Sequence, residues 1–406
     1  MATSVPTPPP ANNPAAIAAA LRNEARRLGF SRVGIASTAF GARDEVPQRW
    51  FRTWLDRGYA GVMEPWLRRQ ESFRRDPQTL LEGARTAVIL ATDHATRAAA
   101  HDEGPCPPGR GRVARYAWGD DYHDLLRKRV NDLAAWLERH APGCKTRGFV
   151  DSAPFPEREF GWLAGLGWFG KNTMLIDPVG GSFFLITVLL TDLELPVDAP
   201  IAVDHCGTCT ACLDACPTGA FVEPRVLDAT KCISSLTIED HGPIAADLRV
   251  AMGDWIFGCD ICQEVCPWNR HAAGSSEPTF QPRSGEPTLA LAELLALDDA
   301  AFRRRFRGSP LLRAKRGGLL RSATIALGNR PDPTSFDALR AALCDAEPVV
   351  RGAAAWALGR WIEFGVLADR ARATLTSRLP EEADPDAREE IDRAICAREP
   401  GTGPTG

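Results

Sequence analysis

Hydrophobic positions between residues 122 and 137 recur every three or four residues, which is the spacing of one helix face. They are Tyr122, Leu125, Leu126, Val130, Leu133, Trp136 and Leu137. Such a stripe is more typical of a helix packed on a core than of a cofactor site. A second helix is predicted from Ala16 to Leu28, with Gly29 as its stop signal.

Short apolar runs interrupt these helical patterns and predict β-strands. The runs are Arg32–Ala36, Ala87–Ala91 and Phe183–Leu190. We therefore expect residues 15–200 to form an α/β domain, although the pattern does not reveal the order of its strands.

Residues 288–398 show helical patterns alone, and they contain an internal echo. Arg321–Gly328 (RSATIALG) resembles Arg351–Gly359 (RGAAAWALG), about thirty residues further on. Similar short helices at this spacing favour stacked helical pairs of the HEAT type. The predicted fold class is therefore α+β and multidomain. We expect a tail at 1–14, a cysteine-rich domain at 201–270, a Gly/Ser/Pro-rich linker at 271–287 and a second tail at 399–406.

The charge of the chain is unevenly distributed. The net charge is −4 and charged residues make up 25% of the 406 positions, so the surface as a whole is not that of a nucleic-acid binder. Between residues 303 and 330, however, nine basic residues occur without an acidic one. A run of this kind is usually a solvated face, but it can also hold phosphates.

No targeting signal is predicted. Residues 1–14 lack a basic start and an apolar centre, and no long apolar run follows Arg26-Arg27, as a twin-arginine signal would require. The longest apolar runs are too short to span a bilayer. We expect a cytoplasmic protein.

Eight of the twelve cysteines lie between residues 206 and 266, and clustered cysteines in a long chain without an export signal indicate metal binding. The first run is Cys206-x2-Cys209-x2-Cys212-x3-Cys216-Pro217, the spacing of bacterial ferredoxins, in which the fourth cysteine binds the other cluster. The second set is Cys232 followed by Cys259-x2-Cys262-x3-Cys266-Pro267.

This crossing-over predicts the ligands of two [4Fe–4S] clusters. One set is Cys206, Cys209, Cys212 and Cys266, and the other is Cys216, Cys232, Cys259 and Cys262. Two zinc sites are the alternative, but zinc does not require the three-cysteine run. The isolated cysteines are predicted to be structural; they are Cys106, Cys144, Cys344 and Cys396.

A candidate active segment precedes the cysteines. Asp151 ends an apolar stretch and could act as a general acid, because a partly buried carboxyl can hold a proton near neutral pH. It could equally cap the following turn. The glycine-rich run from Gly161 to Gly170 matches dinucleotide and phosphate-loop patterns in letters, but it follows no predicted strand, and Asn172 replaces the Ser or Thr that would bind Mg²⁺.

Taken together, several motifs resemble the epoxyqueuosine reductase family. They are VDSAP, AGLGWFGKN, CxxCxxCxxxCP, KCIS, GCDICQEVCPWN and RGGLLRSATIALGN, and the resemblance extends from about Arg74 to Trp361. It implies a cobalamin beside the clusters and a tRNA substrate with epoxyqueuosine at the wobble position, whose epoxide is reduced to an alkene with loss of water.

The resemblance also implies roles for individual residues. Asp151 matches the proton donor beside the cobalamin, and Leu126 stands where a cobalt-binding D-x-H-x-x-G motif would need glycine, so we expect base-off cobalamin without a histidine ligand. Further cobalamin contacts are expected at Arg74, Ser234, Cys259 and Asp260, with looser matches at Arg115, Lys171 and Leu175.

The basic run is the predicted tRNA-binding segment, with contacts at Arg313, Lys315, Arg316 and Arg321. We expect a monomer that receives electrons from an external low-potential donor. Two alternatives are a corrinoid reductive dehalogenase acting on a small molecule and an electron-transfer subunit without an active site. A dehalogenase usually has an export signal, and an electron-transfer subunit would not carry cobalamin.

Overall fold

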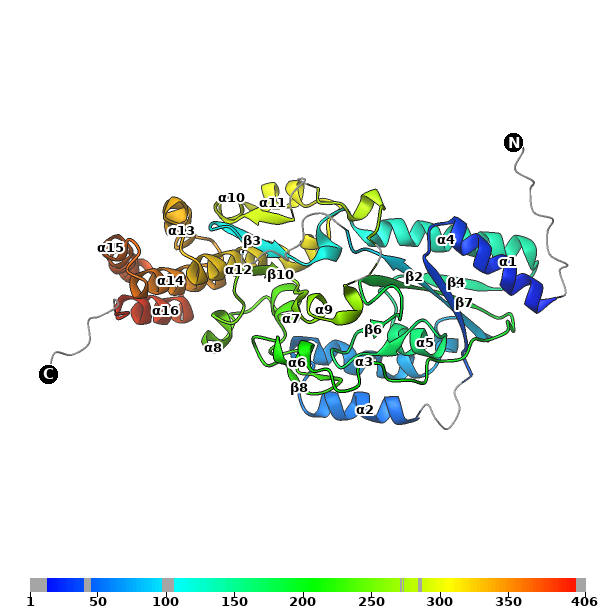
Figure 1. The fold of residues 1–406 in the computed structure, drawn as a ribbon. Helices are drawn as coiled ribbons and strands as arrows, with labels where there is room; N and C mark the ends of the chain where they lie inside the picture. Colours follow the sequence, from blue (N-terminus) through cyan, green and yellow to red (C-terminus); the bar gives the residue numbers. More distant parts are fainter. Residues whose placement is uncertain are drawn as a thin grey trace.

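The computed structural model describes residues 13–39, 45–96, 106–270, 272, 274–283 and 287–398. It is elongated, with the helices α13–α16 at one end, helices α1 and α4 at the other, and the cysteine-bearing elements between them (Figure 1). Of the predicted tails at 1–14 and 399–406, residues 1–12 and 399–406 lie outside the described residues, whereas Asn13 caps a helix that begins at Pro14. Within the described residues, no helix has the length and apolar character needed to cross a membrane.

The N-terminal part is built on a four-stranded antiparallel sheet with the order β1-β2-β7-β4. The strands are β1 (Arg32–Ser37), β2 (Thr86–Asp93), β4 (Thr146–Phe149) and β7 (Phe184–Thr191). The three predicted strands are therefore present, and β4 was not predicted. Its four residues are too short a run to give a clear apolar pattern.

Alternation along β2 explains how the sheet is covered on both faces. Val88 and Leu90 face a core shared with helices α1 (Pro14–Arg27) and α4 (Tyr122–His140). Ala87 and Ile89 face the opposite core, under helix α5 (Glu157–Leu163). Because successive side chains of a strand point to opposite faces, a continuous apolar run is expected when both faces are covered.

The remaining N-terminal elements surround this sheet. They are α2 (Glu45–Asp56), α3 (Glu64–Arg75), β5 (Trp168–Phe169) and β6 (Leu175–Ile176). The cysteine segment contains short elements, which are α6 (Ala211–Asp214), β8 (Phe221–Glu223), β9 (Val226–Leu227), α7 (Ile233–Ile238), α8 (Ala246–Arg249), β10 (Trp255–Phe257) and α9 (Ile261–Glu264). Helices this short are stabilised mainly by their surroundings, because an isolated turn is unstable in water.

A second sheet joins all three parts of the chain. Strand β3 (Arg110–Val113) pairs in parallel with β10 of the cysteine segment and antiparallel with β11 (Thr288–Ala290). Helix η7 (Pro278–Phe280) lies in the predicted 271–287 linker, and its Phe280 is fully buried in the N-terminal core. In its described residues, this segment is therefore packed against the protein.

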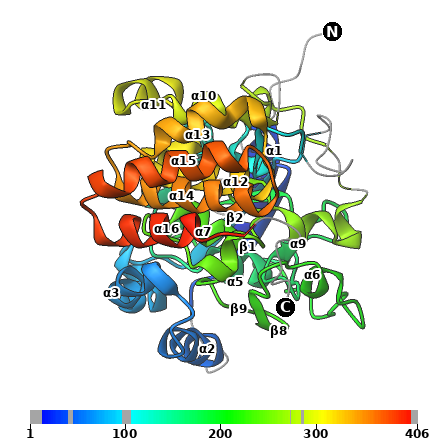
Figure 2. The ribbon, with the colours of Figure 1, turned by 90° about the vertical axis from the view of Figure 1, so that its left-hand side faces the viewer.

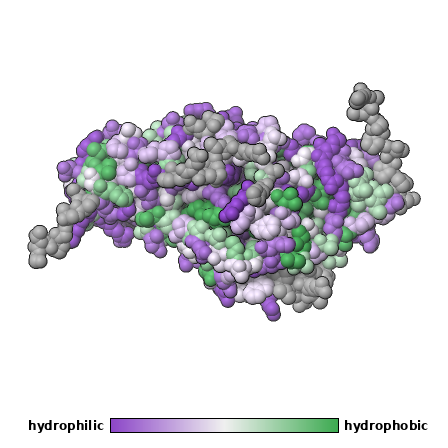
Figure 3. Space-filling view, viewed as in Figure 1, coloured by the Kyte–Doolittle hydropathy of each residue, from purple (hydrophilic) through white to green (hydrophobic). Residues whose placement is uncertain are grey.

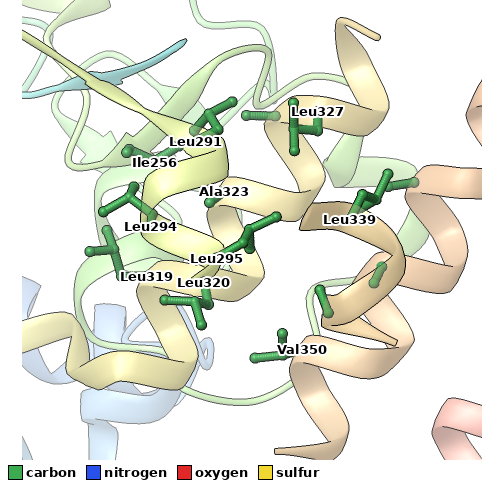
Figure 4. Close-up of a cluster of buried hydrophobic side chains, with 14 of the residues drawn as sticks. Ile256, Leu291, Leu294, Leu295, Leu319, Leu320, Ala323, Leu327, Leu339 and Val350 are labelled. Atoms are coloured by element: carbon green, nitrogen blue, oxygen red, sulfur yellow. The ribbon is translucent and has the colours of Figure 1, made fainter. Parts of the chain in front are cut away.

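The C-terminal part is helical, as predicted. Its elements are α10 (Leu291–Leu295), α11 (Asp299–Arg305), η8 (Pro310–Ala314), α12 (Lys315–Asn329), α13 (Phe336–Ala342), α14 (Pro348–Glu363), α15 (Ala368–Arg378) and α16 (Pro385–Ile395). Figure 2 shows α14, α15 and α16 lying across this end of the molecule. Figure 4 shows leucines of α10 facing those of α12 in its core.

The sequence echo has a packing explanation. Helix α12 packs on α14, and α14 packs on α16. A Cβ added to Gly328 would lie 2.9 Å from the Cα of Ala357, and one added to Gly359 would lie 3.1 Å from the Cα of Ala394. The repeated glycine therefore stands where the next helix approaches closely.

The surface mixes polar and apolar side chains. In the face drawn in Figure 3, hydrophobic areas are scattered among hydrophilic ones. Single exposed apolar residues such as Val179 are normal for a globular protein and need no special explanation.

Candidate cofactor and substrate site

The cysteine runs place their thiols in two adjoining groups. Helices α6 and α9, which follow Cys209 and Cys259, lie next to each other. The Cys212 thiol lies within electrostatic reach of Cys206, Cys209 and Cys266.

The second group gathers around Cys262. Its thiol lies within reach of Cys232, Cys216 and Cys259, and also of Cys212 in the first group. All of these thiols lie close to one another, and their division into two ligand sets stays a prediction from the spacing. Among the described residues, no three His, Cys, Asp or Glu side chains converge on one point as ligands of a single ion would. Ligands of a cubane need not converge in this way, because each thiolate binds its own iron atom.

The loop after β4 presents Asp151 in an uncommon conformation. Asp151 has φ of +46°, in the left-handed region that non-glycine residues rarely adopt, and it is exposed to solvent. The Tyr122 hydroxyl donates a hydrogen bond to its carboxylate at 3.1 Å. The backbone N–H of Asp151 donates to the Glu157 carboxylate, also at 3.1 Å. Two side chains therefore fix this loop from opposite sides of the residue.

Burial and the charge of Asp151 shift the protonation of its neighbours. Burial, followed by the proximity of Asp151, raises the pKa of Glu157 to about 8. The same two causes raise the pKa of the Tyr122 and Tyr116 hydroxyls, so both remain protonated. Such perturbed groups around one carboxylate are typical of proton-transfer sites.

Asp260 follows the cluster cysteine Cys259 and is buried. Its carboxylate accepts a hydrogen bond from the backbone N–H of Arg115 at 2.7 Å, and burial raises its pKa to about 7. The Arg115 guanidinium donates to Glu264 at 3.1 Å and lies 5.3 Å from the ring centre of Phe183. Arg115 and Asp260 therefore join the N-terminal domain to the cluster segment.

The other predicted cofactor contacts have various surroundings. Lys171 donates to the carbonyls of Gly207 and Cys209, at 2.7 and 2.9 Å, and so holds the first cluster loop. Ser234 lies in the first turn of α7, where its backbone N–H points at the Cys232 thiol.

Leu175 is buried in the core beneath Gly161, which makes it part of the core packing rather than an exposed contact. Arg74 of α3 lies over the Phe51 ring at 4.9 Å. Burial lowers the pKa of Arg74, which indicates a cation that its surroundings do not fully compensate.

Three residues near the site were not assigned a role from the sequence. Tyr122 belongs to a helical stripe that predicts core packing, and Glu157 has no signal beyond its proximity to Asp151 along the chain. Asn172, considered only as a departure from a phosphate loop, donates from its side chain to the carbonyl of Cys262 at 3.1 Å. Asn172 is buried, and buried amide groups generally have a hydrogen-bond partner, but the linear sequence does not indicate which one.

The predicted tRNA contacts divide into exposed and enclosed residues. Arg313 is exposed, forms an ion pair with Glu239 at 2.8 Å and lies within electrostatic reach of Asp151. Lys315 is also exposed. Both are therefore open to a partner such as RNA.

The enclosed residues are the other two predicted contacts. Arg321 is fully buried and donates to the carbonyls of Leu236, at 2.6 Å, and Gly242. Arg316 is enclosed by an ion pair with Asp345 and donates to the Leu297 carbonyl at 2.7 Å. Internal carboxylates and carbonyls already satisfy the charge and donors of these two residues in this structure, so we do not propose direct RNA contacts for them.

Comparison with protein-family models matches each part of the chain. Residues 205–269 match "4Fe-4S double cluster binding domain", residues 74–152 match "Epoxyqueuosine reductase QueG, DUF1730" and residues 310–396 match "HEAT repeats". The double-cluster segment and the helical repeats are thereby confirmed. The fold and the site define an iron–sulfur oxidoreductase.

Curated relatives cover nearly the whole chain. Epoxyqueuosine reductase of Pseudomonas aeruginosa is 40% identical over 349 residues, which are 86% of this chain and 95% of the relative. That of Escherichia coli is 40% identical over 83% of this chain and 87% of its own. The chain belongs to the epoxyqueuosine reductase family, as its motifs predict.

Solved structures agree with this assignment. One epoxyqueuosine reductase, determined with an epoxyqueuosine-modified tRNA-Tyr stem loop, has a TM-score of 0.85 and 30% identity, covering 94% of this chain and 99% of its own. The Bacillus subtilis enzyme, described with its catalytic aspartate loop swung out of the active site, has a TM-score of 0.85 and 29% identity, covering 95% of this chain and 100% of its own.

Proposed function

We propose that this chain reduces epoxyqueuosine at the wobble position of tRNA to queuosine. The epoxide of the cyclopentene-derived ring becomes an alkene, and its oxygen leaves as water. This change consumes two electrons and two protons. The site must therefore combine an electron supply, a proton donor and a surface for RNA.

The observation that carries the proposal is the meeting of three chain segments around Tyr116. The Tyr116 hydroxyl lies within electrostatic reach of Asp151 from the N-terminal domain, of Asp260 from the cluster segment and of Arg313 from the helical region. The Tyr116 hydroxyl therefore lies near a candidate proton donor (Asp151), a residue of the cluster segment (Asp260) and an exposed cation (Arg313).

The cysteines fit the iron–sulfur part of the electron supply. Their thiols lie close together, and Lys171 holds the loop of the first predicted set through its carbonyls. [4Fe–4S] clusters span the low potentials that such a reduction needs.

The site also suits a cobalamin. Burial lowers the pKa of Arg74, so this half-buried guanidinium group remains incompletely compensated. The amide and phosphate oxygens of a corrinoid would satisfy such donors. When bound, cobalamin supplies reduced cobalt, a nucleophile or electron donor that side chains cannot replace. Ser234, Asp260 and Asp151 are the other residues that we propose to line it.

Asp151 is proposed to deliver a proton to the epoxide oxygen as it leaves. Its carboxylate is exposed to the site, and the Tyr122 hydroxyl orients it. General acids of this kind must lie within hydrogen-bond distance of the atom that they protonate. Its left-handed backbone conformation does not continue the extended path of β4, and such strained conformations are often found at functional residues.

The helical region is proposed to hold the RNA through Arg313 and Lys315, with the exposed Arg303, Arg304 and Arg307 alongside. Exposed cations bind RNA phosphates with release of counterions. The modified base would then be turned out of the loop into the site, as RNA-binding proteins commonly do with single-stranded bases. We propose that the protein acts as a monomer and takes electrons from an external low-potential donor.

The test uses anaerobically reconstituted protein with cobalamin, a chemical reductant and tRNA that contains epoxyqueuosine. Nucleoside analysis by mass spectrometry should show queuosine appearing at the expense of epoxyqueuosine. Failure of a preparation that holds both clusters and cobalamin would overturn the proposal. A small-molecule reductase would instead act on free halogenated or epoxide substrates and ignore tRNA.

A further inference from the structure

Glu157 occupies the first turn of α5, directly behind the loop that carries Asp151. Its carboxylate accepts the backbone N–H of Asp151 at 3.1 Å. Helix α5 packs against the strands of the large sheet, so this carboxylate is attached to a rigid element. The contact links Asp151 to the framework of the domain.

The conformation of Asp151 needs such support. A left-handed conformation is unfavourable for a residue other than glycine and persists only where its surroundings enforce it. Tyr122 holds the Asp151 side chain and Glu157 holds its backbone. The Bacillus subtilis relative is described with its catalytic aspartate loop swung out of the active site. A loop that can leave the site requires an interaction that keeps it in place.

Glu157 also has an unusual charge environment. Asp151 faces it from the loop, Arg74 faces it from α3 and Arg158 follows it on α5. Burial is the largest influence, and with the negative charge of Asp151 it outweighs the two guanidinium groups and the hydrogen bond from the Asp151 amide, raising the pKa of Glu157 to about 8. Near pH 7 this carboxyl therefore holds a proton, next to a residue that must give one away.

The proposed reaction needs two protons. Both C–O bonds of the epoxide break, two electrons from the low-potential donor form the C=C bond, and the oxygen leaves as water. Asp151 can give one proton, after which it is a carboxylate and must be protonated again. A second proton source close to Asp151 would complete this sequence without waiting for solvent.

We propose that Glu157 is a positioning residue that keeps the Asp151 loop turned into the site and returns a proton to Asp151 within each turnover. This inference rests on the proposed function. Glu157 touches neither substrate nor cofactor; it acts through Asp151.

The experiment compares three variants with the wild-type holoenzyme. Glu157→Gln keeps an acceptor for the Asp151 amide but carries no transferable proton. Glu157→Ala removes both. Glu194→Gln, an exposed glutamate paired with Arg85, is the control. Turnover of epoxyqueuosine tRNA is measured from pH 6 to 9, and hydrogen exchange of residues 150–156 is measured on the same preparations.

We expect Glu157→Gln to slow turnover by about 10²-fold and to remove the decline of rate near pH 8, with loop exchange unchanged. Glu157→Ala should show the same loss together with faster exchange, and Glu194→Gln should resemble the wild type. Wild-type rate and pH profile in Glu157→Gln would overturn the proton role. So would exchange raised to the level of Glu157→Ala, because the rate loss would then come from loop displacement. If the wild type itself makes no queuosine, the proposed function fails instead.

Discussion

Glu157 in the catalytic half is half-buried and Glu382 in the C-terminal helical half is buried, and their surroundings shift the pKa of the two carboxyl groups in opposite directions. Glu382 receives two hydrogen bonds from Arg351, at 2.8 and 2.7 Å, and one from Arg378 at 3.0 Å. The hydrogen bonds from Arg351 are the main reason why its pKa falls to about 2. Glu157 is close to two guanidinium groups without a comparable bond, and its pKa rises to about 8.

This difference reflects the tasks of the two regions. A scaffold is most stable when each enclosed charge has a partner, as with Arg316 and Asp345. A region that transfers protons needs groups whose pKa lies near the working pH, and incomplete compensation provides them. We therefore expect substitutions in the catalytic half to impair chemistry before folding, and substitutions of paired charges in the helical half to do the reverse.

The largest effect is expected for a cluster ligand in the catalytic half. Cys216→Ala should abolish turnover and lower the iron content from about eight to about four atoms per chain, because the spacing predicts its thiol in the second ligand set. Iron analysis and EPR would measure this. Cys232→Ala, in the same set, should leave the same residual signal, whereas Cys206→Ala should leave a different one. The reverse match would refute the pairing.

Asp151→Asn tests the chemical half more finely. Because a general acid typically contributes 10²- to 10⁴-fold, we expect a rate loss of about that size with clusters, cobalamin and melting temperature retained. Single-turnover nucleoside analysis would measure the rate, and optical spectra would measure the retained clusters and cobalamin. Near wild-type turnover would remove Asp151 from the mechanism, and loss of folding would break the contrast between the two halves.

Arg351→Met tests the helical half. Its removal leaves the fully enclosed Glu382 with Arg378 as its remaining arginine partner, so we expect a loss of about 3 kcal/mol in the free energy of unfolding. Denaturant titration measures this loss. The matched control is Arg340→Met, whose exposed pair with Asp337 spans 3.4 Å and should contribute at most about 1 kcal/mol. Equal effects in both variants would contradict the scaffold role of the enclosed pair.

The two glutamates should also differ in their influence on stability against pH. The raised pKa of Glu157 means that the native state holds an extra proton between about pH 4.5 and 8. The stability that this proton contributes is fully present below that window and is lost as pH rises through it. The lowered pKa of Glu382 makes a contribution that is lost only as pH falls toward about 2.

We therefore expect Glu157→Gln to reduce the loss of stability between pH 5 and 9. Glu382→Gln should lower stability by a constant amount across the same range. Denaturant titrations at several pH values would test both expectations. Parallel curves for Glu157→Gln and the wild type would show that Glu157 is ionised throughout.

The smallest effect is expected at the boundary between the halves. Replacing Arg313 and Lys315 by Ala should weaken tRNA binding about tenfold. It should also reduce the slope of log affinity against log salt by about two, because binding with two fewer phosphate contacts releases fewer counterions. Arg393→Ala, an exposed cation on α16, is the control. An unchanged slope in the double variant would assign this surface another role, such as docking a protein electron donor.

The sequence alone determined the features that depend on short distances along the chain. The spacing of the cysteines specifies which loops can wrap a cubane, because three ligands fall within seven residues. The apolar runs predict three strands of the large sheet, and the repeated glycines of α12 and α14 mark the helical echo. Together with the family motifs, these local patterns were sufficient to indicate the reaction class.

The tertiary structure decided which charges remain available. Arg321 and Arg313 belong to the same basic run, yet Arg321 is buried against Leu236, 85 positions away, while Arg313 faces the site. Tyr122 and Asp151 are 29 positions apart, and their hydrogen bond forms because α4 and β4 pack together. Burial and long-range partners determine whether a charge is neutralised or free to act, and a linear pattern does not contain these distances.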